Sequence, residues 1–306
     1  MRHLTVGVFH DEPLGQELGK KGTRSDIAMF NRKMDDCVLT FLAPVEDKLA
    51  PKSQIASTID AAVIVFNEMS RELGETIVML DMMGVTRGIG VTTPYADHDK
   101  VATITKNTAL KSFSIEERDP GKLLQTLMSI RPARDSTSAP LVEVDHSFSV
   151  KGVGEVILGF VKKGIVKKYD NLRLLPANKE VVVRSIQIQD EDYEQAEAGT
   201  RVGLAIKGAT VDEMERGSVL TNLPDLKADT ELNITFKKSP FYADEIKLGA
   251  FHATLGMQTV PITITAKDEE SLTFESARPI VHESGQTILL LDLNAKKTRV
   301  MGKGTS

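Results

Sequence analysis

The sequence predicts an α/β domain followed by two small all-β modules. Three observations lead to this prediction. Short apolar runs alternate with helical patterns in the first part of the chain, the later parts hold short strands separated by Gly, Asn and Asp turns, and two proline-containing linkers separate the three parts. A chain of 306 residues is long enough for two or three cores. We therefore expect domains over residues 1–133, 138–222 and 228–306.

The first domain alternates buried strands with helices. Continuous apolar runs at Leu4–Phe9, Cys37–Leu42 and Ala61–Phe66 are typical of strands that are covered on both faces. Apolar residues at helical spacing follow over Glu72–Gly84 and over Pro120–Ile130, where proline stands in the first turn. Strands that alternate with helices indicate a mostly parallel sheet flanked by helices.

Composition narrows the classes of partner. The formal net charge is −5, whereas a protein that grips a duplex through its whole surface is usually basic, so we expect no DNA partner and only a local patch for any RNA. The single cysteine and the scattered histidines offer no metal-site spacing, so we expect no metal. No window approaches the roughly 18 apolar residues of a membrane helix. We expect a cytoplasmic protein with no membrane partner.

The middle module carries a specific set of turn motifs. They are a G-x-G turn at Gly152–Gly154, a hairpin of the form G-x-V-x-x-x-D at Gly164–Asp170, an A-G-x-x-V-G motif at Ala198–Gly203, and an E-R-G ending at Glu215–Gly217. With these motifs the module resembles the second domain of translational GTPases, and within that family it is most similar to elongation factor Tu and to the selenocysteine-specific elongation factor.

The resemblance extends to the rest of the chain. The segments Ser239–Ile264 and Ala277–Leu293 resemble the third domain of the selenocysteine-specific factor. The resemblance therefore implies a P-loop-NTPase-like α/β domain, in degenerate form, followed by two antiparallel β-barrels that correspond to domains 2 and 3 of elongation factor Tu.

The phosphate loop of this family is altered. A working loop needs G-x-x-x-x-G-K-S/T, whose amides and lysine hold phosphate and whose hydroxyl holds Mg²⁺. After the first strand the chain reads H-D-E-P-L-G-Q-E instead. His10 replaces the first glycine, Gly15 is kept, Gln16 replaces the lysine, and Glu17 replaces the hydroxyl residue. The three acids of this segment would repel a triphosphate.

Two further nucleotide motifs are also missing. The family's D-x-P-G-H segment reads L-A-P-V-E-D at Leu42–Asp47. The guanine-reading N-K-x-D segment has Thr93, Pro94 in place of the lysine, and Ala96 in place of the aspartate, or Asp97 if one residue is inserted. We therefore predict that GTP and Mg²⁺ do not bind, that no residue is catalytic, and that the chain is not an enzyme.

Candidate RNA contacts come from the resemblance and from charge. The family holds the aminoacyl end of tRNA in a pocket of its second domain, and this implies roles for Gln187, Tyr193 and Lys207. Lysines also gather near the C-terminal end, where phosphate contacts and plain surface exposure are both open interpretations. The candidate phosphate contacts there are Lys296, Lys297 and Arg299. Another basic segment, Leu18–Thr23, is interpreted as a solvated turn. His98 is interpreted as part of a solvated loop.

Together these features predict an elongation-factor-like protein that does not hydrolyse GTP. It would bind tRNA, the ribosome or a protein partner through its barrels. Two alternatives stay open. The chain could be a divergent but active GTP-binding factor that holds phosphates by backbone amides alone, or a regulatory interaction module outside translation, because a fold does not dictate a function.

Overall fold

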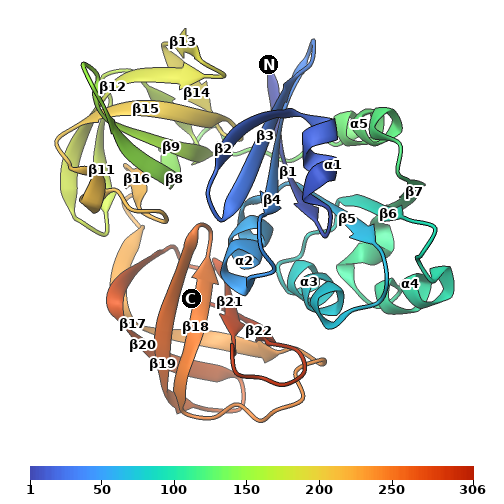
Figure 1. The fold of residues 1–306 in the computed structure, drawn as a ribbon. Coiled ribbons are helices and arrows are strands. Elements are labelled where there is room, and N and C mark those ends of the chain that lie inside the picture. Colours follow the sequence, from blue (N-terminus) through green and yellow to red (C-terminus); the bar gives the residue numbers. More distant parts are fainter.

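A seven-stranded sheet organises the N-terminal domain (Figure 1). The computed structural model describes all 306 residues. The last five strands of the order β2-β3-β4-β1-β5-β6-β7 run parallel, and β2 and β3 add an antiparallel hairpin at one edge. The strands are β1 (Arg2–Phe9), β2 (Lys20–Arg24), β3 (Ile27–Lys33), β4 (Cys37–Pro44), β5 (Ala61–Phe66), β6 (Gly88–Thr92) and β7 (Ser114–Glu117).

Helices cover both faces of this sheet. Two of them pack their leucines on one face, and the others bury apolar residues against the opposite face. The first pair is α1 (Glu12–Leu18) and α5 (Pro120–Ser129); the second group is α2 (Leu49–Thr58), α3 (Arg71–Met82), α4 (His98–Thr105) and the short 3-10 helix η1 (Ala109–Ser112). The strands β1, β4 and β5 are almost entirely buried, as expected for parallel strands covered on both sides.

Two closed six-stranded barrels follow. The middle barrel closes because β11 pairs with both β16 and β12. Its strands are β8 (Leu141–Val150), β9 (Gly154–Lys163), β11 (Asn171–Leu175), β12 (Lys179–Ile188), β15 (Arg201–Lys207) and β16 (Val219–Thr221). Outside the closed ring lie β10 (Ile165–Lys167), β13 (Glu191–Tyr193), β14 (Gln195–Glu197) and the 3-10 helix η2 (Val211–Glu213).

The last barrel has the order β17-β20-β19-β18-β21-β22. Its strands are β17 (Lys227–Lys238), β18 (Gly249–Leu255), β19 (Gln258–Lys267), β20 (Ser271–His282), β21 (Thr287–Leu291) and β22 (Val300–Thr305). The predicted architecture, an α/β domain followed by two antiparallel barrels, is therefore confirmed. No helix in the structure is long and apolar enough to span a bilayer.

Two local interpretations were wrong. The segment predicted as a basic turn forms the end of α1 and the edge strand β2, whose side chains are largely exposed, so no buried apolar residue marks it as a strand. Lysines on an edge strand discourage pairing with another chain. His98 does not lie in a loop but begins α4, because the carboxylate of Asp97 accepts a hydrogen bond from the Lys100 amide (3.1 Å) and caps the helix.

The N-terminal domain and the last barrel share one apolar core. The core cluster that includes α2 and α3 also contains Leu289, Leu291 and Val300 of the last barrel, together with Phe160 from the middle barrel. Nearby, the hydroxyls of Ser53 on α2 and Thr254 on β18 lie 2.9 Å apart and are buried. Because these contacts exclude water, the interface between the two parts resembles the interior of a single domain.

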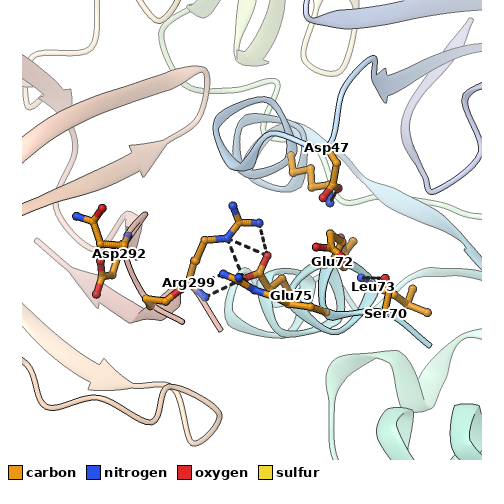
Figure 2. A network of polar contacts seen from close by, with 12 residues as sticks. Asp47, Ser70, Glu72, Leu73, Glu75, Asp292 and Arg299 are labelled. Atoms are coloured by element: carbon orange, nitrogen blue, oxygen red, sulfur yellow. Dashed lines mark hydrogen bonds and ion pairs between the residues drawn. The ribbon is translucent and has the colours of Figure 1, made fainter. Parts of the chain in front are cut away.

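A buried ionic contact reinforces the same junction (Figure 2). The carboxylate of Glu75 on α3 is fully buried and accepts hydrogen bonds from the Arg299 backbone amide (3.0 Å), Nε (2.9 Å) and Nη2 (2.6 Å). Arg71 also donates to Glu75 (3.2 Å) and to the Ala295 carbonyl (3.0 Å). Burial alone would raise the pKa of Glu75, but the bonds from Arg299 outweigh it and lower the pKa. We call this contact the Glu75–Arg299 latch.

Removing one partner of the latch should cost more than removing both. Glu75→Ala leaves the Arg299 guanidinium without its counter-charge, and we expect the free energy of unfolding to fall by about 3 kcal/mol. In the double variant Glu75→Leu, Arg299→Leu the free energy of unfolding should fall by much less, because no buried charge is left unpaired; Arg71, which also contacts Glu75, is 40% exposed and can be hydrated. Urea denaturation of the three proteins measures both values, and equal losses for the single and double variants would contradict this account.

Candidate functional site

His10 closes the end of β1, where a phosphate loop would begin. Its backbone has a positive φ of 66°, a conformation that glycine adopts more easily. The ring Nε2 lies 2.9 Å from the Thr76 hydroxyl of α3, and that hydroxyl already donates to the Glu72 carbonyl. The ring must therefore donate through Nε2–H. Burial, aided by the charge of Lys52, lowers the pKa of His10 to about 4, so the ring is neutral at pH 7.

At the start of α1, one backbone amide already has a partner and one residue has no amide hydrogen. Phosphates bind at helix starts because the first amides lack partners within the helix. Here Asp11 supplies an internal anion, since its carboxylate accepts a hydrogen bond from the Leu14 amide (3.0 Å), and Pro13 has no N–H to offer. Gly15 is needed for packing instead, because a Cβ there would lie 2.7 Å from the Phe30 ring.

Internal arginines neutralise the acids of this segment. Arg118, between β7 and α5, donates from Nε to Asp11 (3.1 Å) and from Nη1 to Glu17 (2.8 Å). Arg24 of β2 pairs with Glu12. The expected picture of carboxylates that line a phosphate pocket therefore needs correction: the acids are real, but each has a cation of the same chain as its partner.

The residues at the other two nucleotide motifs are also buried or bonded to partners within the chain. Leu42, at the position of the Mg²⁺-holding aspartate, is fully buried, and Asp47 pairs with Lys52, which is only 3% exposed (Figure 2). In the guanine-reading segment, the Thr93 hydroxyl donates to the Phe66 carbonyl (3.2 Å). The Ala96 amide donates to the Thr93 carbonyl (3.0 Å) in a turn that also contains the exposed Pro94. Asp97, which follows Ala96, caps α4.

A cleft of about 1300 Å³ separates the β2–β3 hairpin from the middle barrel. One wall is basic and includes Lys20, Lys21, Arg32 and Lys33. The other wall comes from the barrel. One part of it is apolar and is formed on β8, β9 and the turn between them by Phe148, Val150, Val153, Val156 and Leu158. The remaining part carries polar side chains, which are Ser185, Gln187, Gln189, Asp190, Glu191 and Arg201. Strand register continues this wall with small residues, because Val156 lies beside Ala205 and Leu158 beside Gly203.

Arg201 links the two walls of the cleft. Its Nη2 lies 3.2 Å from the Asp145 carboxylate of the barrel and 3.2 Å from the Thr23 hydroxyl of β2. Its Nε is buried and has no hydrogen-bond partner. The guanidinium of Arg201 thus joins the two walls and keeps one buried donor unused.

The structure separates the residues that the resemblance implied for an RNA pocket. Gln187 lines the cleft, and so do Gln16 and Glu17 of the relic loop. Tyr193 lines a smaller cavity of about 280 Å³ instead, and Lys207 is exposed and lines neither of these two cavities. Sequence reasoning missed the cleft because its basic wall lies on β2 and β3. The available signal was the set of three cations within five residues of β2, Lys20, Lys21 and Arg24.

The three candidate phosphate contacts near the C-terminal end differ in whether they already have a partner. Lys296 and Lys297 are exposed in the loop between β21 and β22. Arg299 is not available, because its guanidinium is bound to buried Glu75. This contact argues against a phosphate contact at Arg299, and its observed role is to join α3 to the last barrel.

The neutral His10 ring should make the protein sensitive to acid. The pKa of His10 is about 4 in the folded state and 6.5 when unfolded, so its contribution to stability is complete above pH 6.5 and is lost as the pH falls toward 4. Between pH 7 and pH 5 the free energy of unfolding should fall by about 1–2 kcal/mol more than in His10→Asn. Asn tolerates the same backbone conformation. Chemical denaturation at the two pH values measures this difference; parallel losses would contradict the assignment.

Comparison with known proteins agrees with the fold and the motifs. A family model described as elongation factor Tu domain 2 matches residues 154–221. A protein of Methanocaldococcus jannaschii of uncharacterized function is 37% identical over 308 residues, which cover 99% of each chain. The selenocysteine-specific elongation factor of the same organism is 29% identical over 89% of this chain, but the match spans only 63% of that factor's length.

A solved structure agrees with this result. Elongation factor SelB from Methanococcus maripaludis, in complex with the GTP analogue GppNHp, matches all of this chain and 79% of its own, with a TM-score of 0.85 and 25% identity. The chain therefore belongs to the translational GTPase family, together with the Methanocaldococcus protein and the selenocysteine-specific elongation factors.

Proposed function

We propose that the chain is an elongation-factor-like protein that binds the single-stranded acceptor end of tRNA in the cleft, and that it does so without binding or hydrolysing GTP. The observation that carries the proposal is the chemical difference between the two walls of the cleft. A single-stranded RNA end has phosphates along its backbone and flat, weakly polar bases. The cations of the basic wall can contact the phosphates, and the apolar side chains opposite them can pack against the bases.

The charges of the cleft favour an anionic ligand although the whole chain is acidic. Five of its lining side chains are cationic and three are acidic, whereas the chain as a whole has a net charge of −5. Lys20 and Lys21 lie on the outermost strand of the sheet and are exposed, so they can reach a phosphate without losing internal partners. A local basic patch of this kind supplies most of the affinity of proteins for nucleic acid.

The apolar side chains of the barrel wall favour a ligand that contains a base or an aminoacyl group in addition to its phosphates. Phe148, Val156 and Leu158 lie on the outside of the barrel, where polar residues would be expected, yet all three are half-buried and face the cleft. Exposed apolar surface of this kind marks a binding site more often than a solvated surface. The small neighbours Gly203 and Ala205 leave room for a flat ring against the wall.

The absence of a GTP requirement is inferred from the relic loop. Asp11 holds an amide that a phosphate would need, Arg118 holds the acids in place, and Gln16 offers no charge where the loop lysine would stand. To admit a triphosphate, these internal contacts would have to break, and the acids released would repel it. The relative from Methanococcus maripaludis was solved with a GTP analogue, so binding to that protein is a suitable positive control.

Calorimetric titration tests the GTP part of the proposal. We expect no saturable heat when GTP or GDP with Mg²⁺ is added at concentrations up to about 1 mM, because the charge and amide requirements for phosphate binding are unmet. The Methanococcus maripaludis factor should bind under the same conditions. Saturable micromolar binding by this chain would overturn the inference and favour the divergent active GTPase.

Fluorescence anisotropy with labelled tRNA tests the RNA part. Lys20→Gln with Lys21→Gln should weaken binding at least tenfold and reduce the dependence of log affinity on log salt by about 1.4, the value for two lost contacts to a single strand. A matched control, Lys106→Gln with Lys111→Gln, removes the same charge at exposed positions outside the cleft. Equal losses for both pairs would show non-specific attraction, and no binding of wild-type protein at low salt would leave a protein partner as the remaining interpretation.

A further inference from the structure

The hairpin formed by β12 and β13, residues 186–193, has empty space on both of its sides. Gln187, Gln189 and Glu191 line the large cleft. Gln189 and Tyr193 also line the cavity of about 280 Å³ between the hairpin and the start of β1. Ile186 and Ile188 anchor the base of the hairpin in the barrel core. Only its tip, residues 189–193, borders a cavity on each side and can move without displacing core side chains.

The hairpin is also weakly attached to its own barrel. β13 pairs only with the end of β12, and its three residues are exposed and lie outside the closed ring of strands. Short edge pairings with exposed backbone hydrogen bonds open at low cost. The turn itself is tight, because Gln189 and Asp190 both have positive φ values (52° and 64°) that are typical of a two-residue hairpin turn. The tip can therefore move while β12 stays paired with β15 as far as Gln187.

One ion pair ties the hairpin to the N-terminal domain. Lys33 Nζ, at the end of β3, lies 3.1 Å from both carboxylate oxygens of Glu191. The two side chains are 46% and 58% exposed, and no other hydrogen bond or ion pair joins residues 189–193 to that domain. Exposed pairs are individually weak and are screened by salt. The Glu75–Arg299 latch differs, because it is buried and lies beside a shared core.

We propose that the tip of the β12–β13 hairpin, residues 189–193, is a gate on the cleft, with Lys33–Glu191 as its latch. When the pair separates, the hairpin swings toward the smaller cavity and the RNA end enters; when the pair re-forms, the RNA end is enclosed. The identity of the ligand rests on the function proposed above, whereas the motion of the hairpin does not. Salt should therefore act on this protein in two ways, by screening the phosphates and by releasing the gate.

A reversible crosslink tests the gate. In Lys33→Cys with Glu191→Cys, a bis-methanethiosulfonate reagent joins the two thiols, and dithiothreitol releases them; the native Cys37 is buried and does not react. Crosslinking before RNA is added should slow association at least tenfold, and crosslinking afterwards should slow dissociation at least tenfold. Both rates should recover on reduction. The same protein without crosslinker is the control, because its charges are identical. Unchanged rates with and without the crosslink would overturn the proposal.

A second crosslink and a measurement without RNA separate this inference from the proposed function. A disulfide in Ser53→Cys with Thr254→Cys joins the N-terminal domain to the last barrel, where we expect no motion, and should leave both rates unchanged. Hydrogen exchange of the amides of residues 189–193 should quicken in Glu191→Lys and in Lys33→Glu, and return toward the wild-type rate in the double charge swap. If no RNA binds but exchange follows this pattern, only the proposed ligand fails; if exchange does not respond, the gate fails.

Discussion

The burial of α2 and α3 against the last barrel is the constraint on which the rest of the structure depends. One continuous core runs through both parts, and Glu75 at its edge is stabilised only while Arg299 of the barrel lies against it. A buried carboxylate without this partner would be costly, so the two parts must adopt one relative position. That position sets the direction of the sheet edge and therefore where the basic wall of the cleft faces the middle barrel.

The N-terminal domain keeps the shape of a nucleotide-binding domain while its own side chains take over the functions of a ligand. In such domains, phosphates satisfy the amides at the start of a helix and balance nearby cations. Here the carboxylate of Asp11 satisfies one of these amides, Arg118 balances Asp11 and Glu17, and the His10 ring contacts α3 from the end of β1. The loop is thus stabilised by contacts within the chain.

The outcome of the sequence predictions follows from how local each signal is. Apolar runs and glycine turns are read within a few residues, so the sheet and both barrels could be predicted. The partners of charged residues could not be, because Arg118 lies 107 residues from Asp11 and Arg299 lies 224 residues from Glu75. Composition showed acids in the relic loop but not their arginines. It showed lysines near the C-terminal end but not which of them was already bound.

The cleft combines one fixed wall with one that is partly mobile. The basic wall belongs to the sheet that is locked to the last barrel, whereas the opposite side ends in a hairpin with free space behind it and a single exposed ion pair in front. A chain that binds RNA without GTP, as proposed above, would need a way to admit a large ligand and hold it that does not use a nucleotide. A weak ionic latch beside the binding surface meets that need, because RNA that enters the cleft competes for Lys33 with Glu191. Entry of the ligand would then itself help to open the latch, without any nucleotide.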